Sequence, residues 1–266
     1  MPALRDTLRN NVKEKLARDE VVASMTVRLC RTTEIAQIAR TAGFDTIYVD
    51  LEHNMFSFDS TGQICMAALQ AGIAPFVRVP SISPEFISRV LDGGALGVIA
   101  PGVRSGDEAR AVVAAARYAP AGSRGLVAGL PHFGFRSIPA AEALPALNEA
   151  TLVMVQCESA ASLDATEEIV AIDGIDMVMI GSNDLLADLG LAGQYDHPRL
   201  AQAYERVIAA CRRRGKHVGV GGLATRPDLV AKFVQLGARY VSTGTDLAFL
   251  AAECARRARQ VKELKP

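Results

Sequence analysis

One pattern recurs eight times along this 266-residue chain: a short apolar run is followed by an amphipathic stretch. Glycine precedes several of the runs, as in Ala42-Gly43-Phe44, where a helix can end in the left-handed conformation. Nearly continuous apolar strands that alternate with helices are typical of a parallel sheet covered by helices. Eight such units predict an α/β fold, a closed (β/α)8 TIM barrel. The predicted strands are 23–29, 46–50, 75–79, 96–100, 151–158, 177–181, 216–221 and 239–244.

The amphipathic stretches predict the helices, and a further helix is expected at 3–18, within an N-terminal segment 1–20. The connection 119–150 is long and rich in Gly and Pro, which favours an ordered loop over a pocket or at a subunit contact. No segment has the composition of a linker, so residues 1–266 are expected to form one barrel domain. The predicted helices are 32–42, 58–71, 84–91, 105–117, 159–171, 184–189 with 197–214, 226–236 and 246–261.

Composition narrows the class of function. Lys plus Arg and Asp plus Glu number 29 each, so no basic surface for nucleic acid is expected. No apolar run is long enough for a membrane span, and the N-terminus has no apolar signal region. The five cysteines form no CxxC pair, which favours reduced thiols and a cytoplasmic location.

Polar residues gather where four of the predicted strands end. In a (β/α)8 barrel, functional side chains lie at these carboxyl ends and in the loops just after them. Each residue alone has an ordinary explanation, such as a structural ion pair for Arg78 or a favourable helix N-terminal charge for Glu158. Eight of them at one rim indicate an active site instead. They are Asp50, Glu52, His53, Arg78, Gln156, Glu158, Asn183 and Asp184.

Glu158 and Asp184 predict a metal site. They follow neighbouring strands, so their like charges would raise each other's pKa unless a cation intervened. Such oxygen ligands suit Mg²⁺, Mn²⁺ or another octahedral divalent ion better than a closed zinc site. Arg78 would face this pair and stabilise an oxyanion such as an enolate. The backbone N–H groups of Ser182 and Asn183, at a helix start, could bind the carboxylate of a small 2-oxo acid.

The lysines argue against a Schiff-base mechanism. All six lie in predicted helices, at the C-terminus or at the entry to the seventh strand. None follows the carboxyl end of a strand, where the polar rim lies. A metal ion is therefore expected to take the role of electron sink.

Several segments resemble the HpcH/HpaI family of metal-dependent (class II) 2-oxo-acid aldolases. The segments are "VDLEHN", "PFVRVP", "RVLDGGALGVIAPGVRSGDEARAVVAAARYAPAGSRG", "VQCESAASLDATEEIVAIDGIDMVMIGSNDLLADLG" and "GARYVSTGTDLAFL", in the family's order. The resemblance implies a barrel of the phosphoenolpyruvate/pyruvate-binding type. It also implies reversible cleavage of 4-hydroxy-2-oxo acids to pyruvate, or hydroxypyruvate, and an aldehyde.

The resemblance implies roles for single residues as well. His53 matches the general base, which acts through a water on the aldol hydroxyl, and Arg78 matches the group that stabilises the enolate. Gln156 and the backbone around Asn183, including Ser182 and Asp184, match substrate contacts.

The matched metal ligands are Glu158 and Asp184, for Mg²⁺, Mn²⁺ or Co²⁺, with Zn²⁺ as a further option. Asp50 and Glu52 are expected to orient metal-bound waters or neighbouring side chains. Asp92 matches an aspartate that pairs with the catalytic histidine across a subunit boundary. The resemblance therefore implies a homo-oligomer, a hexamer built as a trimer of dimers, with the C-terminal helix 246–266 exchanged between subunits.

Two segments depart from the family pattern. "GSNDL" lacks the usual Pro-Ala pair, and the loop after "GSRGL" reads "VAGLPHFGFRS" in place of an Arg-rich stretch. His132, Phe133 and Arg136 of that loop either help to define the aldehyde acceptor or belong to a packed loop. Three other functions remain open: a barrel lyase for acyl-CoA thioesters, a phosphosugar enzyme using the glycines of "GVGG" and "VSTGTD", and a non-catalytic barrel.

Overall fold

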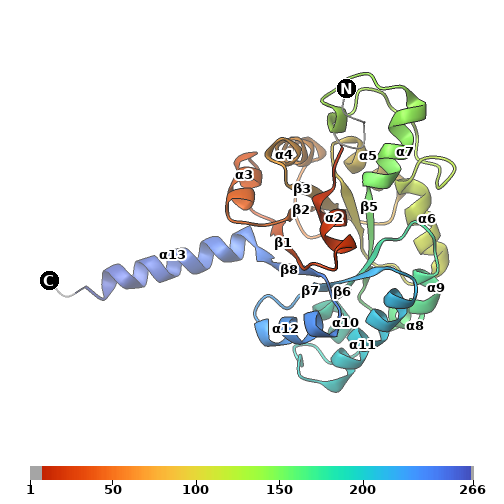
Figure 1. Cartoon of the computed structure of the whole chain (residues 1–266). Coiled ribbons are helices and arrows are strands. Elements are labelled where there is room, and N and C mark those ends of the chain that lie inside the picture. Colours follow the sequence, from red (N-terminus) through yellow and green to blue (C-terminus); the bar gives the residue numbers. More distant parts are fainter. Residues whose placement is uncertain (1–7, 265–266) are drawn as a thin grey trace.

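Eight parallel strands close into a barrel, in sequence order, in the computed structural model, which describes residues 8–264 (Figure 1). Helices surround this barrel, so the predicted (β/α)8 architecture is confirmed. The strands are β1 (Val22–Val27), β2 (Thr46–Asp50), β3 (Ala74–Arg78), β4 (Gly97–Ala100), β5 (Leu152–Cys157), β6 (Met177–Gly181), β7 (His217–Gly221) and β8 (Tyr240–Thr245).

The helices follow the strands as the alternating pattern predicts. Their bounds are α2 (Asn11–Ala17), α3 (Glu34–Thr41), α4 (Phe58–Ala71), α5 (Pro84–Asp92), α6 (Gly106–Ala116), the 3-10 helix η1 (Pro131–Phe133), α7 (Ala140–Ala150), α8 (Ala160–Asp164), α9 (Thr166–Val170), α10 (Ser182–Asp188), α11 (Pro198–Arg213), α12 (Pro227–Leu236) and α13 (Asp246–Lys262).

Large side chains fill the interior of the barrel. Phe76 of β3 and Tyr240 of β8 lie parallel with ring centroids 6.2 Å apart, and neither side chain is exposed. Gly97 of β4 is the register partner of Phe76, and it leaves the space that the aromatic ring occupies. This pairing of a large with a small residue is how a narrow barrel is packed without a pore.

The N-terminal helix is shorter than predicted. The sequence favours a helix at 3–18, but α2 begins at Asn11, and residues 3–7 lie outside the described chain. Asn10 starts the helix, because its side chain accepts hydrogen bonds from the N–H groups of Val12 and Lys13. Its Nδ2 also donates to the carbonyls of Leu96 and Ala150, which ties α2 to the amino end of the barrel.

Segment 119–150 is only in part the ordered loop that its Gly and Pro content favours, because its second half forms α7. The helix tolerates Pro145 in its interior, and it buries one face made of Ala143, Ala146, Leu147 and Ala150. These spacings of three and four residues are the helical period. The high proline content concealed that period in the sequence.

The single helix predicted at 159–171 is interrupted at Ala165, between α8 and α9. The hydroxyl of Thr166 donates to the carbonyl of Leu163 at 2.7 Å, so a side chain competes there with the helical backbone.

Strand register places the polar side chains of the rim. Asp50 and Arg78 are paired neighbours at the ends of β2 and β3. Between β1 and β8 the register shifts between Ser24 and Thr26, and Thr26 pairs with Thr245. Such irregularities occur beside active sites, where they redirect side chains.

Helix α13 extends away from the barrel (Figure 1). Asp246, its first residue, is the one buried residue of this helix. Leu247, Leu250 and Val261 are at least half exposed, at 50%, 55% and 68%. This helix of 17 residues therefore leaves several apolar side chains exposed among its charged ones.

Substitution of Gly97 tests the packing inside the barrel. A Cβ atom at this position would lie 2.6 Å from two carbon atoms of the Phe76 ring, which is itself fully buried. We expect Gly97→Ala to lower the free energy of unfolding by roughly 1–3 kcal/mol, measured by urea denaturation. The matched control is Gly125→Ala, because nothing lies within 4 Å of a Cβ there. Equal stability of the two variants would contradict the packing described.

Candidate active site

A cavity of about 220 Å³ opens at the carboxyl ends of the strands. Five of the residues predicted from the sequence line it, namely His53, Arg78, Gln156, Asn183 and Asp184. They lie on β3 and β5, in the turn after β2 and at the start of α10, so the structure brings together side chains that are far apart in the chain. The rest of the lining is Thr26, Arg28, Tyr48, Met179, Gly181, Gly221, Gly222, Ala224, Ser242, Gly244 and Thr245.

Asp50 and Arg78 form a buried two-point ion pair at the wall of this cavity. Nε and Nη2 of Arg78 donate to the two oxygens of Asp50 at 2.9 and 2.8 Å. The Asp50 side chain is fully buried, and that of Arg78 is 11% exposed. The forked geometry fixes the plane of the guanidinium. Asp50 thus orients a neighbouring side chain, one of the two roles expected for it.

Electrostatics hold both partners of this pair in their charged forms. Burial alone would raise the pKa of Asp50, but the hydrogen bonds and charge of Arg78 outweigh burial and lower that pKa. Burial likewise opposes the charge of Arg78, yet its hydrogen bonds to Asp50 raise its pKa above the ordinary value. The guanidinium is therefore a permanent cation in the cavity wall.

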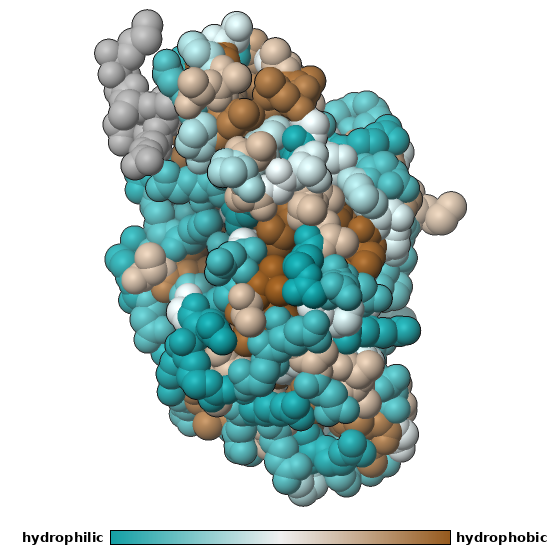
Figure 2. Space-filling view, turned by 90° about the vertical axis from the view of Figure 1, so that its right-hand side faces the viewer, coloured by the Kyte–Doolittle hydropathy of each residue, from teal (hydrophilic) through white to brown (hydrophobic). Residues whose placement is uncertain are grey.

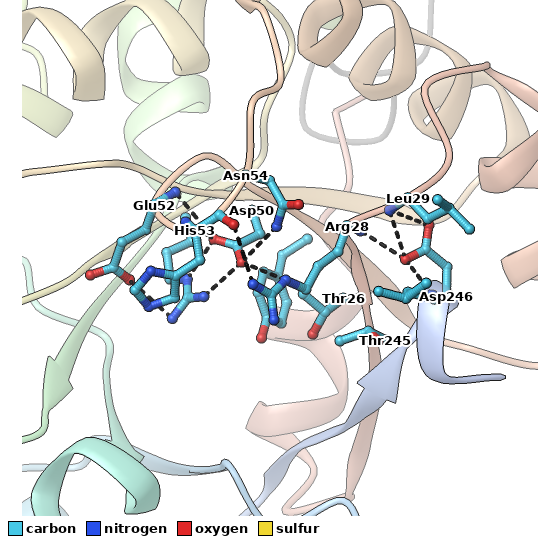
Figure 3. A network of polar contacts seen from close by, with 12 residues as sticks. Thr26, Arg28, Leu29, Asp50, Glu52, His53, Asn54, Thr245 and Asp246 are labelled. Carbon is cyan, nitrogen blue, oxygen red and sulfur yellow. Dashed lines mark hydrogen bonds and ion pairs between the residues drawn. The ribbon is translucent and has the colours of Figure 1, made fainter. Parts of the chain in front are cut away.

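Glu52 and His53 extend this network toward solvent (Figure 3). Oε2 of Glu52 lies 3.0 Å from Nη1 of Arg78 and 3.6 Å from Nε2 of His53. The backbone N–H groups of Glu52 and His53 both donate to Oδ1 of Asp50, which shapes the turn after β2. The imidazole is half exposed and lines the cavity, so it can reach a ligand or a water there.

Gln156 lines the cavity on the side of β5, and Glu158, which is not itself part of the lining, lies directly behind it. Nε2 of Gln156 donates to Oε2 of Glu158 at 2.9 Å, and the N–H of Gly102 donates to Oε1 at 2.6 Å. Gly181 of β6 makes room for them, because a Cβ there would lie 3.1 Å from Oε2 of Glu158. The other amide oxygen, Oε1 of Gln156, is buried without a hydrogen-bond partner among the described residues. A buried polar atom of this kind calls for a ligand.

The carboxylates at this rim are close enough to disturb one another. Burial raises the pKa of Glu158, and the charges of Glu52 and Asp184 raise it further. Burial also raises the pKa of Glu52, against the opposing effect of Arg78. A divalent cation would relieve this repulsion, so the donor set fits an oxygen-ligated metal. Within residues 8–264, no three His, Cys, Asp or Glu side chains form a complete metal site, so substrate or water would supply further ligands.

At the start of α10, Asn183 and Asp184 face the cavity, but the side chain of Ser182 does not. Oγ of Ser182 is 2.9 Å from the hydroxyl of Tyr204 and is fully buried. Oδ1 of Asn183 accepts a hydrogen bond from Tyr195 at 2.8 Å, which holds the amide in place. The backbone N–H of Ser182 stays a predicted substrate contact.

Asp92 lies far from the cavity of its own chain. It ends α5 just before β4 begins, and so belongs to the amino end of the barrel. Its carboxylate is 2.6 Å from Nη2 of Arg124, whose guanidinium lies 4.5 Å over the Tyr118 ring. The Asp92 side chain is 35% exposed, whereas Arg124 is almost fully buried. Within one chain, Asp92 cannot contact His53.

His132, Phe133 and Arg136 do not border the cavity, so the first of the two interpretations of this loop is wrong within a single chain. Nε2 of His132 lies 3.0 Å from the carbonyl of Ala95, which precedes β4 at the amino end of the barrel. Burial lowers the pKa of His132 to about 4, so the imidazole is neutral. Phe133 is buried, and Nε of Arg136 donates to its carbonyl, as in a packed loop.

Sequence reasoning missed the wall formed by β1 and β8. Thr26, Arg28, Ser242 and Thr245 line the cavity there. The signal for Arg28 was present, since a lone Arg at the end of the apolar run 23–29 is the same feature that identified Arg78. The hydroxyl residues gave no such signal, because Ser and Thr are common at strand ends.

The geometry so far defines a (β/α)8 barrel with a polar cavity at the carboxyl ends of its strands, where a fixed guanidinium lies near several carboxylates. The family model described as HpcH/HpaI aldolase/citrate lyase matches residues 28–252 of this chain. The chain belongs to this family.

Named relatives are aldolases. The 4-hydroxy-4-methyl-2-oxoglutarate aldolase tasA of Hapsidospora irregularis is 35% identical over 252 residues, 92% of this chain and 93% of its own. The 4-hydroxy-2-oxo-heptane-1,7-dioate aldolase of Salmonella typhimurium is 37% identical over 222 residues, 81% of each chain. The crystal structure of an HpcH/HpaI aldolase from Desulfitobacterium hafniense has a TM-score of 0.89, 31% identity and coverage of 95% and 97%.

Removal of the Asp50 charge tests the buried pair. We expect Asp50→Asn to lower the free energy of unfolding by about 3–5 kcal/mol at pH 7, because Arg78 then lacks its forked partner. The control is Glu20→Gln, which removes an exposed ion pair to Arg18 and should cost less than about 1 kcal/mol. Urea denaturation measures both values.

The same pair predicts a pH dependence. The pKa of Asp50 is lowered in the folded chain, so the pair contributes its full stability above the ordinary carboxyl pKa of about 4. That contribution is lost as the pH falls toward the lowered pKa. The stability difference between wild type and Asp50→Asn should therefore be constant from pH 7 to 5 and shrink below about pH 4. A difference that grew at acid pH would contradict the lowered pKa.

Proposed function

We propose that this chain is a metal-dependent aldolase that reversibly cleaves 4-hydroxy-2-oxo acids to pyruvate, or hydroxypyruvate, and an aldehyde. One observation carries the proposal: a guanidinium fixed by Asp50 lines the same cavity as the Asp184 carboxylate and His53, and Glu158 is hydrogen-bonded to Gln156 of the cavity wall. The names of the relatives point to the same reaction.

Glu158 and Asp184 would hold a divalent metal ion, Mg²⁺, Mn²⁺ or Co²⁺, with Zn²⁺ as a further option. Bound there, the ion would draw electron density from the 2-oxo acid and acidify its C3 position. The unpartnered Oε1 of Gln156 lies beside Glu158 and would accept a hydrogen bond from a water or from substrate in that place. The N–H groups at the start of α10 would bind the substrate carboxylate.

In the cleavage direction, His53 would accept the proton of the C4 hydroxyl through a water, and the C3–C4 bond would break. The electron pair of the C3–C4 bond would pass to C3 and form the enolate of the 2-oxo acid, while C4 would leave as the carbonyl carbon of the aldehyde. Arg78 would stabilise the enolate oxygen, because its charge is permanent and its plane is fixed by Asp50. Protonation of C3 then gives pyruvate or hydroxypyruvate.

Chelation tests the metal requirement. We expect EDTA treatment to abolish retro-aldol activity and added Mg²⁺ or Mn²⁺ to restore it. Glu158→Gln should weaken Mn²⁺ binding, measured by electron paramagnetic resonance without substrate, by more than about 100-fold, because a ligand itself is lost. The control is Glu205→Gln, on the exposed face of α11, which should bind Mn²⁺ as wild type does. Full activity after chelation, or wild-type Mn²⁺ affinity in Glu158→Gln, would overturn the metal assignment.

We further propose that the active unit is a homo-oligomer, a hexamer arranged as a trimer of dimers, with α13 packed on a neighbouring subunit. The helix carries exposed apolar residues, and Asp246 is its one buried residue. A second exposed apolar group is visible at the top of the molecule in Figure 2, where Figure 1 places α7 and the segment before it. Leu126, Val127 and Phe135 of that segment are 60%, 44% and 64% exposed.

Asp92 is proposed to complete the active site of a neighbouring subunit by pairing with its catalytic histidine. Arg124 holds the Asp92 carboxylate at 2.6 Å while 35% of the Asp92 side chain stays exposed. A carboxylate fixed in this way can be presented to another chain. All five cysteines are free thiols, which suits the cytoplasmic location that we also propose.

Mixed oligomers test the shared site. Asp92→Ala and His53→Ala homo-oligomers should each be inactive, because every site lacks one group. Co-expressed subunits should recover about one quarter of wild-type activity, since one site in four then has both groups if the subunits mix at random. Activity per site and mass by light scattering measure the result. A mixture as inactive as its parents, at wild-type oligomer size, would show that Asp92 does not serve a neighbouring site.

A further inference from the structure

Arg28 brings a second cation to the cavity. It follows directly after β1, lines the cavity, and is 35% exposed. Figure 3 shows its side chain extending past Thr26 toward Asp50 and His53. The reaction scheme above gives this guanidinium no task.

The charge of Arg28 is only partly matched by its neighbours. Its Nε lies 3.3 Å from Oδ2 of Asp50, and its Nη2 donates to the carbonyl of His53 at 3.3 Å. Both oxygens of Asp50 are already bound at shorter distances by Arg78. Nη1 of Arg28 donates no hydrogen bond to any part of the chain between residues 8 and 264. An exposed guanidinium with free donors in a closed-in cavity is suited to an anion.

Asp246 fixes the backbone from which Arg28 projects. Its Oδ1 accepts the N–H of Arg28 at 2.8 Å, and its two oxygens also accept those of Leu29 and Cys30. This carboxylate at the start of α13 is 7% exposed. Three hydrogen bonds to successive N–H groups leave the segment little freedom, so the guanidinium is held at one place on the rim (Figure 3).

Hydroxyl groups continue the same wall inward. Oγ of Ser242 lies 3.3 Å from Oγ1 of Thr26 and 3.2 Å from the hydroxyl of Tyr48, and all three residues line the cavity. Hydroxyls rotate their protons toward an acceptor, so they can donate to a carboxylate. Arg28 and these hydroxyls belong to β1, β2 and β8, which lie across the closed barrel from Gln156 and Glu158 of β5.

We propose that Arg28, with the hydroxyls of Thr26 and Ser242, is a binding subsite for a carboxylate on the aldehyde half of the substrate. The relatives are named for substrates with a second carboxylate, and this assignment makes Arg28 the residue of this chain that would select for one at or near C4. The 2-oxo acid end would lie toward Gln156 and Asp184, the C3–C4 bond between Arg78 and His53, and the second carboxylate at Arg28. This inference rests on the proposed aldol cleavage and assigns a residue that determines its substrate specificity.

Two substrates that differ in one group test the subsite. Both 4-hydroxy-2-oxoglutarate and 4-hydroxy-2-oxopentanoate carry the 2-oxo acid and the C4 hydroxyl, but only the first has a carboxylate at C5. The measured quantity is the ratio of their kcat/KM values, in wild type, Arg28→Gln and Arg28→Lys. The control is Arg31→Gln, since Arg31 lies on the same segment and its guanidinium lies over the Phe56 ring.

Wild type and Arg31→Gln are expected to favour the diacid. Arg28→Gln should lower the diacid-to-monoacid ratio by about 10–100-fold, the effect of one lost hydrogen bond to a charged group. Arg28→Lys should recover part of the ratio, because it keeps the charge but not the fork. An equal loss on both substrates would show that Arg28 acts through Asp50 or on the carboxylate common to both, and would overturn the subsite. An unchanged ratio would overturn it as well.

A binding measurement separates this inference from the aldolase proposal. Glycolate is a stable analogue of glyoxylate, the aldehyde released from the diacid, and its binding requires no reaction. Saturation-transfer NMR should show glycolate bound to wild type and to Arg31→Gln, and at least about 10-fold weaker on Arg28→Gln. If glycolate binding is weakened only in Arg28→Gln but no aldol cleavage is detected, the proposed reaction is wrong and the subsite stands. Cleavage of both substrates with an unchanged ratio in Arg28→Gln would keep the proposed reaction and overturn the subsite.

Discussion

The ion pair between Asp50 and Arg78 is the interaction on which the site depends. Register places the two residues side by side at the ends of β2 and β3. Because the pair is buried, removal of either partner would leave an uncompensated buried charge, which is strongly destabilising. Glu52 and Arg28 are arranged around it, and the turn that carries His53 is hydrogen-bonded to Asp50. One carboxylate thus positions the proposed base and both guanidiniums.

The cavity has two walls of different chemistry. Gln156 of β5 and Asp184 of α10, with Glu158 just behind them, suit a divalent cation, whereas Arg28 and the hydroxyls at the ends of β1 and β8 suit an anion. The register shift between β1 and β8 and the anchoring of Arg28 by Asp246 shape the second wall. Asp246 also begins α13, so the helix proposed to pack on a neighbour starts at the active site.

The eight strands and most of the site followed from the sequence, because a closed parallel barrel gathers strand ends at one rim. His53, Arg78, Gln156, Asn183 and Asp184 could be identified in that way. Other features depend on contacts that the sequence does not display. The side chain of Asn10 caps the start of α2, and α7 forms despite Pro145. The place of Arg28 depends on Asp246, more than 200 residues away, and that of His132 on Ala95.

The central claim is that the cavity generates the enolate of a 2-oxo acid, and the half-reaction without aldehyde tests it most directly. NMR in deuterated water follows exchange of the methyl protons of pyruvate. The account predicts exchange that requires both the enzyme and a divalent cation and that falls by at least about 100-fold in Arg78→Met, where the charge that stabilises the enolate is lost. Absence of exchange in the metal-loaded wild type, or equal exchange in Arg78→Met, would contradict it.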